Sequence, residues 1–131
     1  MDGVYYDAVG NLIGIERKGD AMINEFAINE FAKEVHQNSV NHGWWDDERE
    51  FPEIIALCHS ELSEALEAYR NGEEMMWMNG EKPDGIGIEL CDCIIRILDY
   101  LAHKGFDIEF GLIAKHGYNL TRPYKHGGKK I

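Results

Sequence analysis

The stretch IGIELCDCIIRILDYL, residues 86–101, decides the fold. Most of its residues are apolar, and a helix that is apolar on nearly every side is normally buried. Four charged residues interrupt it: Glu89, Asp92, Arg96 and Asp99. At 3.6 residues per turn, their spacings place them within an arc of roughly 80°. The stretch therefore predicts a buried helix, from about residue 86 to 104, that carries one narrow charged stripe.

A buried stripe of carboxylates requires compensation, because each buried carboxylate costs several kcal/mol unless it is paired or bound to a metal. Arg96 can neutralise one of the three acids on its helix, which leaves Glu89 and Asp92 in need of another partner. The alternative is that the stripe faces solvent and carries surface ion pairs. This helix alone does not separate the two interpretations.

A second helix is expected from about Pro52 to Arg70, because proline suits the first helical turn and Asn71-Gly72 ends the pattern. Glu61 and Glu64 lie three residues apart and so share one side of it. The same side of the helix also carries the apolar residues Leu57 and Ala68, whereas a side that faces solvent would carry mainly polar residues. The expected core face consists of Ile54, Ile55, Cys58, Leu62, Ala65, Leu66 and Tyr69.

Packed antiparallel, these two helices would bring four carboxylates to one place. Such a cluster repels itself and favours hard divalent cations with oxygen ligands, above all Mg²⁺, with Mn²⁺ as the other possibility. Di-iron bundles carry Glu-x-x-His on two helices, and no histidine here follows a glutamate by three residues. We expect His59, which adjoins the cluster in sequence, in the core or behind the ligands.

The remaining elements are expected to complete an all-α four-helix bundle with a short N-terminal β-hairpin, residues 1–19. The hairpin strands flank a turn at Gly10-Asn11, and Asp20 is a suitable cap for a first helix of about 20 residues. Residues 73–87 are expected to be irregular. Asp107 should cap a fourth helix that ends near Asn119. One domain thus spans 1–131, with a helical body at 20–122 and a basic tail at 123–131.

Composition limits the function. A net charge of -11 makes the chain a poor non-specific binder of nucleic acid. No apolar run is long enough for a membrane span or resembles a signal peptide, so a cytoplasmic protein is expected. The three cysteines lack zinc-site spacing and are expected to be buried free thiols.

Charge is distributed unevenly along the chain. From residue 115 to the end there is no acid, and the cations are Lys115, Arg122, Lys125, Lys129 and Lys130. One interpretation is a frayed, solubilising tail. The other is a cation cluster that holds an anion beside an acidic, metal-filled pocket.

Together these motifs resemble a known family. Glu61-x-x-Glu64 followed by Glu89-x-x-Asp92 is similar to the ExxE…ExxD signature of the MazG-like all-α nucleoside triphosphate pyrophosphohydrolases, whose relatives include dimeric dUTPases and dCTP pyrophosphatases. Residues 115–123 resemble the family's K…N..RP segment, and residues 43–45 resemble an aromatic loop that some members use near the base. The resemblance covers roughly residues 23–129.

The sequence also departs from the family pattern. Many members have two adjacent glutamates at the first motif, whereas Ser60 precedes Glu61 here, so one acidic contact is missing. The N-terminal hairpin and residues 75–78 have no counterpart that we identify, which leaves the preferred base open.

The resemblance implies Mg²⁺-dependent hydrolysis of a nucleoside triphosphate to a monophosphate and pyrophosphate. Glu61, Glu64, Glu89 and Asp92 would hold Mg²⁺ against the triphosphate, and Glu61 or Glu64 would help to deprotonate the attacking water. The residues expected to hold phosphate are Lys115, Asn119, Arg122, Lys125 and Lys129. The candidates for stacking or contact with the base are Trp44, Trp45, Tyr118 and His36, with Trp77 as a further aromatic candidate.

Each of these assignments has a plain alternative: the cations can belong to a solvated helix end, and the aromatic residues to a core or an interface. The broad apolar helices favour a homodimer or homotetramer. Two other functions stay open, namely a non-catalytic acidic interaction module and a relative that binds nucleotides without turning them over.

Overall fold

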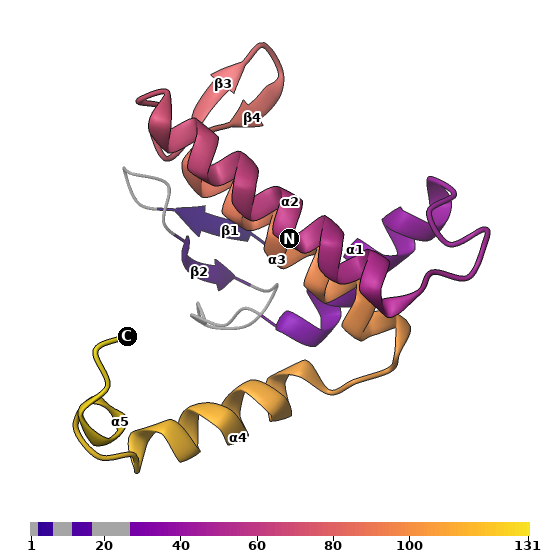
Figure 1. The fold of residues 1–131 in the computed structure, drawn as a ribbon. Helices are drawn as coiled ribbons and strands as arrows, with labels where there is room; N and C mark the ends of the chain where they lie inside the picture. The colour runs from indigo at the N-terminus through magenta and orange to yellow at the C-terminus, as the bar shows by residue number, and fades with distance from the viewer. Residues whose placement is uncertain (1–2, 7–11, 17–26) are drawn as a thin grey trace.

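The computed structural model describes residues 3–6, 12–16 and 27–131, and most of these residues are helical (Figure 1), which confirms the mostly helical prediction. Asp20 lies outside the described residues, but the predicted first helix of about 20 residues was too long. The helix has 14 residues and begins only at Ile28, because the backbone at Ala27 is extended. In chain order the elements are β1 (Gly3–Tyr6), β2 (Leu12–Glu16), α1 (Ile28–Asn41), α2 (Phe51–Arg70), β3 (Trp77–Asn79), β4 (Lys82–Asp84), α3 (Ile86–His103), α4 (Ile108–Leu120) and the short α5 (Lys125–Gly128).

Helices α2 and α3 form an antiparallel pair, and Figure 1 shows them side by side along most of their length. At one end of the pair the rings of Phe51 and Tyr100 lie 5.2 Å apart. At the other end the chain turns back on itself, and the Ile86 amide donates to the Glu74 carbonyl over 3.0 Å. This packing brings the two acidic i, i+3 pairs to the same level.

The α2–α3 interface has a small core of Ile54, Cys58 and Cys93, against which Trp45 and Tyr100 pack. Burial of these apolar groups, at about 25 cal/mol per Å², holds the pair together. All three cysteines are free, but Cys91 is exposed, so the expectation that all three are buried was wrong for this residue. Cys91 lies two residues before the buried Cys93, and side chains two residues apart point to different sides of a helix, so the two cannot share one buried face.

Helix α1 packs on α3 around a second core of Ala32, Leu98 and Ile108. Ile108 belongs to the first turn of α4, which is anchored by polar contacts to α1. The Asn29 side-chain oxygen accepts from the Ile108 amide over 2.9 Å. Asp107 caps α4, as the sequence predicts, by accepting from the Phe110 amide over 3.1 Å.

Beyond this first turn α4 extends away from the three packed helices, as Figure 1 shows. Within one chain, therefore, α1, α2 and α3 pack together, and α4 is attached by its start. The apolar side chains that α4 exposes include Phe110, Leu112, Ile113 and Leu120.

Residues 73–87, expected to be irregular, contain a second antiparallel hairpin, so that expectation was wrong. Strands β3 and β4 pair with Trp77 opposite Asp84 and Asn79 opposite Lys82. Gly80, with φ of 66°, permits the tight turn between them. The predicted N-terminal hairpin corresponds to β1 and β2, which pair antiparallel. Their connection lies outside the described residues, whereas the mid-chain hairpin of β3 and β4 is described in full.

The mid-chain hairpin meets the start of α3 at very short range. The Gly87 amide donates to the Met75 carbonyl over 2.8 Å. A Cβ on Gly85 would lie 2.6 Å from the Glu74 carbonyl oxygen, and one on Gly87 would lie 2.9 Å from that of Met75. Only glycine allows this approach at the two positions, and it fixes the hairpin beside the first turn of α3.

The expected core face of α2 is only partly buried. Ile54, Cys58 and Ala65 are buried as predicted, together with Ala68. The prediction was wrong for Ile55, Leu62, Leu66 and Tyr69, which are exposed. The exposed large apolar residues of α3 are Leu90, Ile94, Ile95 and Ile97. In one chain the α2–α3 pair thus buries one face and exposes a second apolar face.

Candidate functional site

The structure brings three acidic side chains into one group. One carboxylate oxygen from each of Glu61, Glu89 and Asp92 lies within 4.8 Å of the others. Glu61 comes from the middle of α2 and is only 6% exposed, whereas Glu89 and Asp92 come from the first two turns of α3 and are half-buried. Three carboxylates at this spacing could hold a hard divalent cation. We call them the acidic group.

Glu64, the fourth predicted ligand, lies beside this group and is exposed. Contact with the Glu61 carboxyl, followed by partial burial, raises the pKa of Glu64 above its ordinary value. Glu64 therefore shares the electrostatic environment of the group and stands one turn along α2, closer to solvent.

Burial and repulsion also raise the pKa values of Glu89 and Asp92. Burial, then the neighbouring Glu64, Asp92 and Asp84 carboxylates, raise the pKa of Glu89 to about 7. Burial and then Glu61 raise the pKa of Asp92. Close carboxylates that are partly buried resist ionisation, and a positive charge placed among them would favour their ionised forms.

The raised pKa of Glu89 leads to a pH prediction for the metal-free protein. A folded pKa of about 7, against an ordinary value of 4.5, means that the contribution of Glu89 to stability is complete below pH 4.5 and is lost as the pH rises through 7. Urea unfolding in EDTA should show that the wild type loses stability relative to Glu89→Gln between pH 5 and pH 8. Parallel stability curves for the two proteins would contradict this.

Arg96 is the cation in contact with the acidic group. Its Nε donates to Glu61 Oε1 over 2.7 Å, across the α2–α3 interface. The carboxylate that Arg96 contacts thus belongs to α2 and not to its own helix, because the helix packing places Glu61 closer. Its charge also lowers the pKa values of Glu64 and Asp92, against the repulsion of the group.

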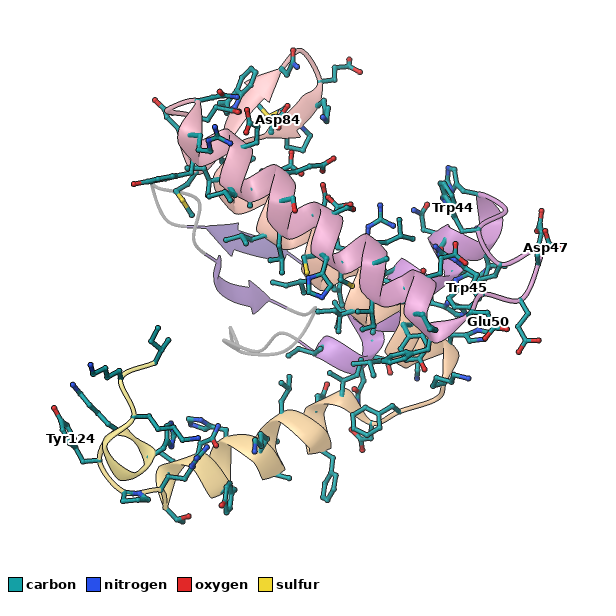
Figure 2. All side chains as sticks on the ribbon, in the orientation of Figure 1. Trp44, Trp45, Asp47, Glu50, Asp84 and Tyr124 are labelled. Carbon is teal, nitrogen blue, oxygen red and sulfur yellow. The ribbon has the colours of Figure 1, made fainter. Side chains whose placement is uncertain are left out.

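The mid-chain hairpin adds Asp84 to the surroundings of the group, and Figure 2 shows it at the hairpin end of the α2–α3 pair. Asp84 accepts from the Gly85 amide over 2.9 Å, and this hydrogen bond lowers its pKa. The sequence analysis did not predict Asp84 as a neighbour of the acidic group. Its position just before the buried helix that carries Glu89 could have indicated it.

A pocket of about 520 Å³ opens beside the acidic group. Glu61, Asp92 and Arg96 line it, together with side chains of α1 and of the loop that follows α1. This volume is within the range of small-molecule sites. The side chains from α1 and the loop are Phe31, Glu34, Val35, Asn38, Ser39, Trp44 and Arg49.

Asp99 lies in the same pocket, two turns along α3 from Asp92. It is 7% exposed and is surrounded by hydrogen-bonding groups. His36 Nδ1 lies 2.7 Å from its Oδ1, Ser39 Oγ donates to Oδ2 over 2.8 Å, and Trp45 Nε1 donates over 3.0 Å. Asp99 therefore connects α3 to α1 and to the loop after α1.

The candidate base-binding residues differ in their surroundings. Trp44 is 63% exposed and lines the pocket. Trp45 is half-buried and stacks on His103 with ring centroids 3.9 Å apart, and His36 is hydrogen-bonded to Asp99. Trp77 lies on β3 and donates to Glu73 over 2.8 Å. Of the tryptophans, Trp44 is thus the one that the structure places on the pocket wall.

The predicted phosphate-binding residues lie on α4 and in the tail. Lys115, Asn119, Arg122, Lys125 and Lys129, and the base candidate Tyr118, do not line this pocket in the described chain. Figure 2 shows Tyr124, just before α5, on the side of the molecule away from Trp44 and Asp84. In a single chain these residues therefore lie apart from the pocket beside the acidic group.

His59 is exposed on α2 and is not part of the acidic group. The expectation that it lies in the core or behind the ligands was wrong. It follows the buried Cys58 directly, and successive helical residues point about 100° apart, so its side chain leaves the interface.

Comparisons with known proteins identify no relative. No protein-family model, no curated protein and no solved structure matches the chain. Within residues 3–6, 12–16 and 27–131, none of the helices is both long and apolar enough to cross a membrane.

Proposed function

We propose that this protein is a Mg²⁺-dependent nucleoside triphosphate pyrophosphohydrolase of the MazG-like all-α type, which releases a nucleoside monophosphate and pyrophosphate in the cytoplasm. The observation that carries the proposal is the acidic group of Glu61, Glu89 and Asp92 at the wall of a ligand-sized pocket. Two acidic i, i+3 pairs lie on packed helices, and three of their four carboxylates, those of Glu61, Glu89 and Asp92, are close enough to share one cation, which supports this chemistry.

In this proposal the acidic group holds the metal ion through its carboxylate oxygens, with Mn²⁺ as an alternative ion. A bound Mg²⁺ would neutralise phosphate charge and orient a water molecule for in-line attack at phosphorus. Glu64 is the residue that we assign to accept the proton of that water, because it lies beside the group, is open to solvent and has a raised pKa. Glu61 is the alternative base.

At the other end of the pocket, Trp44 offers an exposed ring on which a base can stack. The network of Asp99, His36, Ser39 and Trp45 supports this wall by fixing α1 and the following loop against α3. We assign Trp45 and His36 to positioning this wall, with the base contact itself on Trp44.

We further propose that the chain works as a homodimer or homotetramer. The exposed apolar residues of α2, α3 and α4 require cover. A second copy that covers them would complete the four-helix arrangement, and it would bring Lys115, Asn119, Arg122, Lys125, Lys129 and Tyr118 to the pocket of its partner.

The oligomer proposal predicts that Leu66→Glu shifts the protein toward monomer. Leu66 is 60% exposed in the single chain, so a charge there costs little in the monomer but is costly at an apolar interface. Light scattering coupled to gel filtration should give at least twice 15.0 kDa for the wild type. The control is Glu67→Gln on the same helix. A monomeric wild type would contradict the proposal.

Turnover is tested with the purified protein, Mg²⁺ and a panel of common and modified ribo- and deoxyribonucleoside triphosphates, with detection of pyrophosphate. We expect release that Glu61→Gln abolishes and Glu67→Gln leaves intact, because Glu67 is an exposed acid of the same helix paired with Arg70. Nucleotide binding without release would indicate an inactive relative. Neither binding nor release from any triphosphate would favour the acidic interaction module.

A further inference from the structure

Arg96 lines the pocket beside the acidic group. Its Nε contacts Glu61 Oε1 at 2.7 Å, and its side chain is 36% exposed where that of Glu61 is 8% exposed. Among the described residues, no hydrogen bond engages its two terminal nitrogens Nη1 and Nη2. The guanidinium therefore donates one hydrogen bond to the acidic group, through Nε. The N–H groups of Nη1 and Nη2 can still donate to a ligand in the pocket that Arg96 lines.

This position conflicts with a bound cation. Glu61 belongs both to the ion pair with Arg96 and to the group that could hold a metal. A divalent cation held by Glu61, Glu89 and Asp92 would repel a guanidinium that contacts one of its ligands. It would also remove the need for Arg96 as a counter-ion, because it supplies two positive charges to the same carboxylates.

The second arginine of the pocket shows a different environment. The Arg49 side chain is 9% exposed, and its guanidinium lies 5.9 Å from the Trp44 ring centre and 5.5 Å from that of Trp45. Arg49 is thus held by packing against the loop, whereas Arg96 is partly exposed and held at one nitrogen. Of the two, Arg96 is the one free to exchange partners.

We propose that Arg96 is an exchangeable counter-ion, which neutralises Glu61 in the metal-free protein and turns its terminal nitrogens to the phosphate oxygens of the nucleotide once a divalent cation occupies the acidic group. The inference rests on the proposed function and adds a phosphate-binding residue from within the pocket. The planar fork of arginine suits a phosphate, on which it can donate two parallel hydrogen bonds.

The exchange is tested by measuring how Arg96→Gln changes two affinities of the whole chain, one for Mg²⁺ and one for a triphosphate analogue. We expect the first affinity to increase and the second to decrease. Calorimetry with Mg²⁺ alone should show tighter binding, by about 5- to 20-fold, because a competing positive charge is gone. Binding of a non-hydrolysable triphosphate analogue at saturating Mg²⁺ should weaken by about 10- to 100-fold, because a charged hydrogen-bonding partner of the phosphates is lost.

Two further variants complete the test. Arg70→Gln makes the same change on the exposed part of α2, where Arg70 pairs with Glu67, and should alter neither affinity. Arg96→Lys keeps the charge and loses the fork, so it should bind Mg²⁺ like the wild type and bind the analogue less tightly. Arg96→Gln leaves Glu61 without its partner and could therefore unfold. In that event Arg96→Lys, which keeps the charge, still tests the exchange.

The outcomes separate the two proposals. If wild-type protein binds Mg²⁺ and the Arg96 variants weaken both affinities or change neither, the exchange is overturned and the proposed function stands. If the wild type binds no Mg²⁺, the proposed function fails and the exchange fails with it.

Discussion

Asp92→Asn should lower kcat/KM for nucleoside triphosphate hydrolysis by more than about 100-fold, since even groups behind the ligands of a metal site typically cost 10- to 100-fold. The substitution keeps the shape of the side chain and removes the charge that would bind the metal. Asp92 lies within 4.8 Å, oxygen to oxygen, of Glu61 and Glu89 in the acidic group. Steady-state rates across a Mg²⁺ series would measure the loss.

The same substitution should not destabilise the metal-free fold. Burial and the Glu61 charge raise the pKa of Asp92, so its ionised form is unfavourable without a cation. Thermal unfolding in EDTA should therefore give a melting temperature equal to or above that of the wild type. In Mg²⁺ the wild type should gain more stability than the variant, because a ligand stabilises the state that binds it. Full activity of Asp92→Asn would contradict the role of Asp92 as a metal ligand. A melting temperature in EDTA well below that of the wild type would also contradict it, because the lost activity would then reflect unfolding.

Asp99→Ala should destabilise the protein by about 2–4 kcal/mol, since a buried hydrogen-bonding group left without its partner costs about 1–3 kcal/mol. Three side chains lose their acceptor at once: His36, Ser39 and Trp45. Asp99 is only 7% exposed, so little water can reach these three groups in place of its carboxylate. Urea unfolding followed by tryptophan fluorescence would measure the change, and Trp45 would report it directly.

The matched control is Asp47→Ala, in the exposed loop that Figure 2 shows beyond Trp45. It makes the same chemical change on the surface and should shift the free energy of unfolding by less than about 0.5 kcal/mol. A loss below about 1 kcal/mol for Asp99→Ala would mean that the network does not hold α1 and the loop against α3.

The helices were predictable because their ends carry local chemistry. Pro52 and Gly72 bound α2, Gly105 follows α3, and Asp107 caps α4, each through its own backbone or side-chain preference. The acidic pairs were predictable for the same reason, since an i, i+3 spacing places two side chains on one face. To predict that the two acidic pairs lie close together, one further assumption was needed, namely that the two helices pack antiparallel.

Features that depend on packing between elements could not be predicted in this way. The partner of Arg96 is set by the register of α2 against α3, which no local pattern encodes. Asp99 shares a stripe with Asp92, but it lies two turns away and meets α1 and its loop. The β3–β4 hairpin lacks an alternating apolar pattern, and Pro83 disfavours a strand. The direction of α4 is likewise set by the contacts of its first turn with α1. The sequence could therefore not predict that Lys115 lies away from the pocket.

A ³¹P NMR time course of the wild-type protein, with Mg²⁺ and the triphosphate from the panel that releases most pyrophosphate, would identify the bond that is broken. We expect nucleoside monophosphate and pyrophosphate to appear in equal amounts, and EDTA to stop the reaction. A diphosphate with orthophosphate as products, or turnover that persists in EDTA, would contradict it.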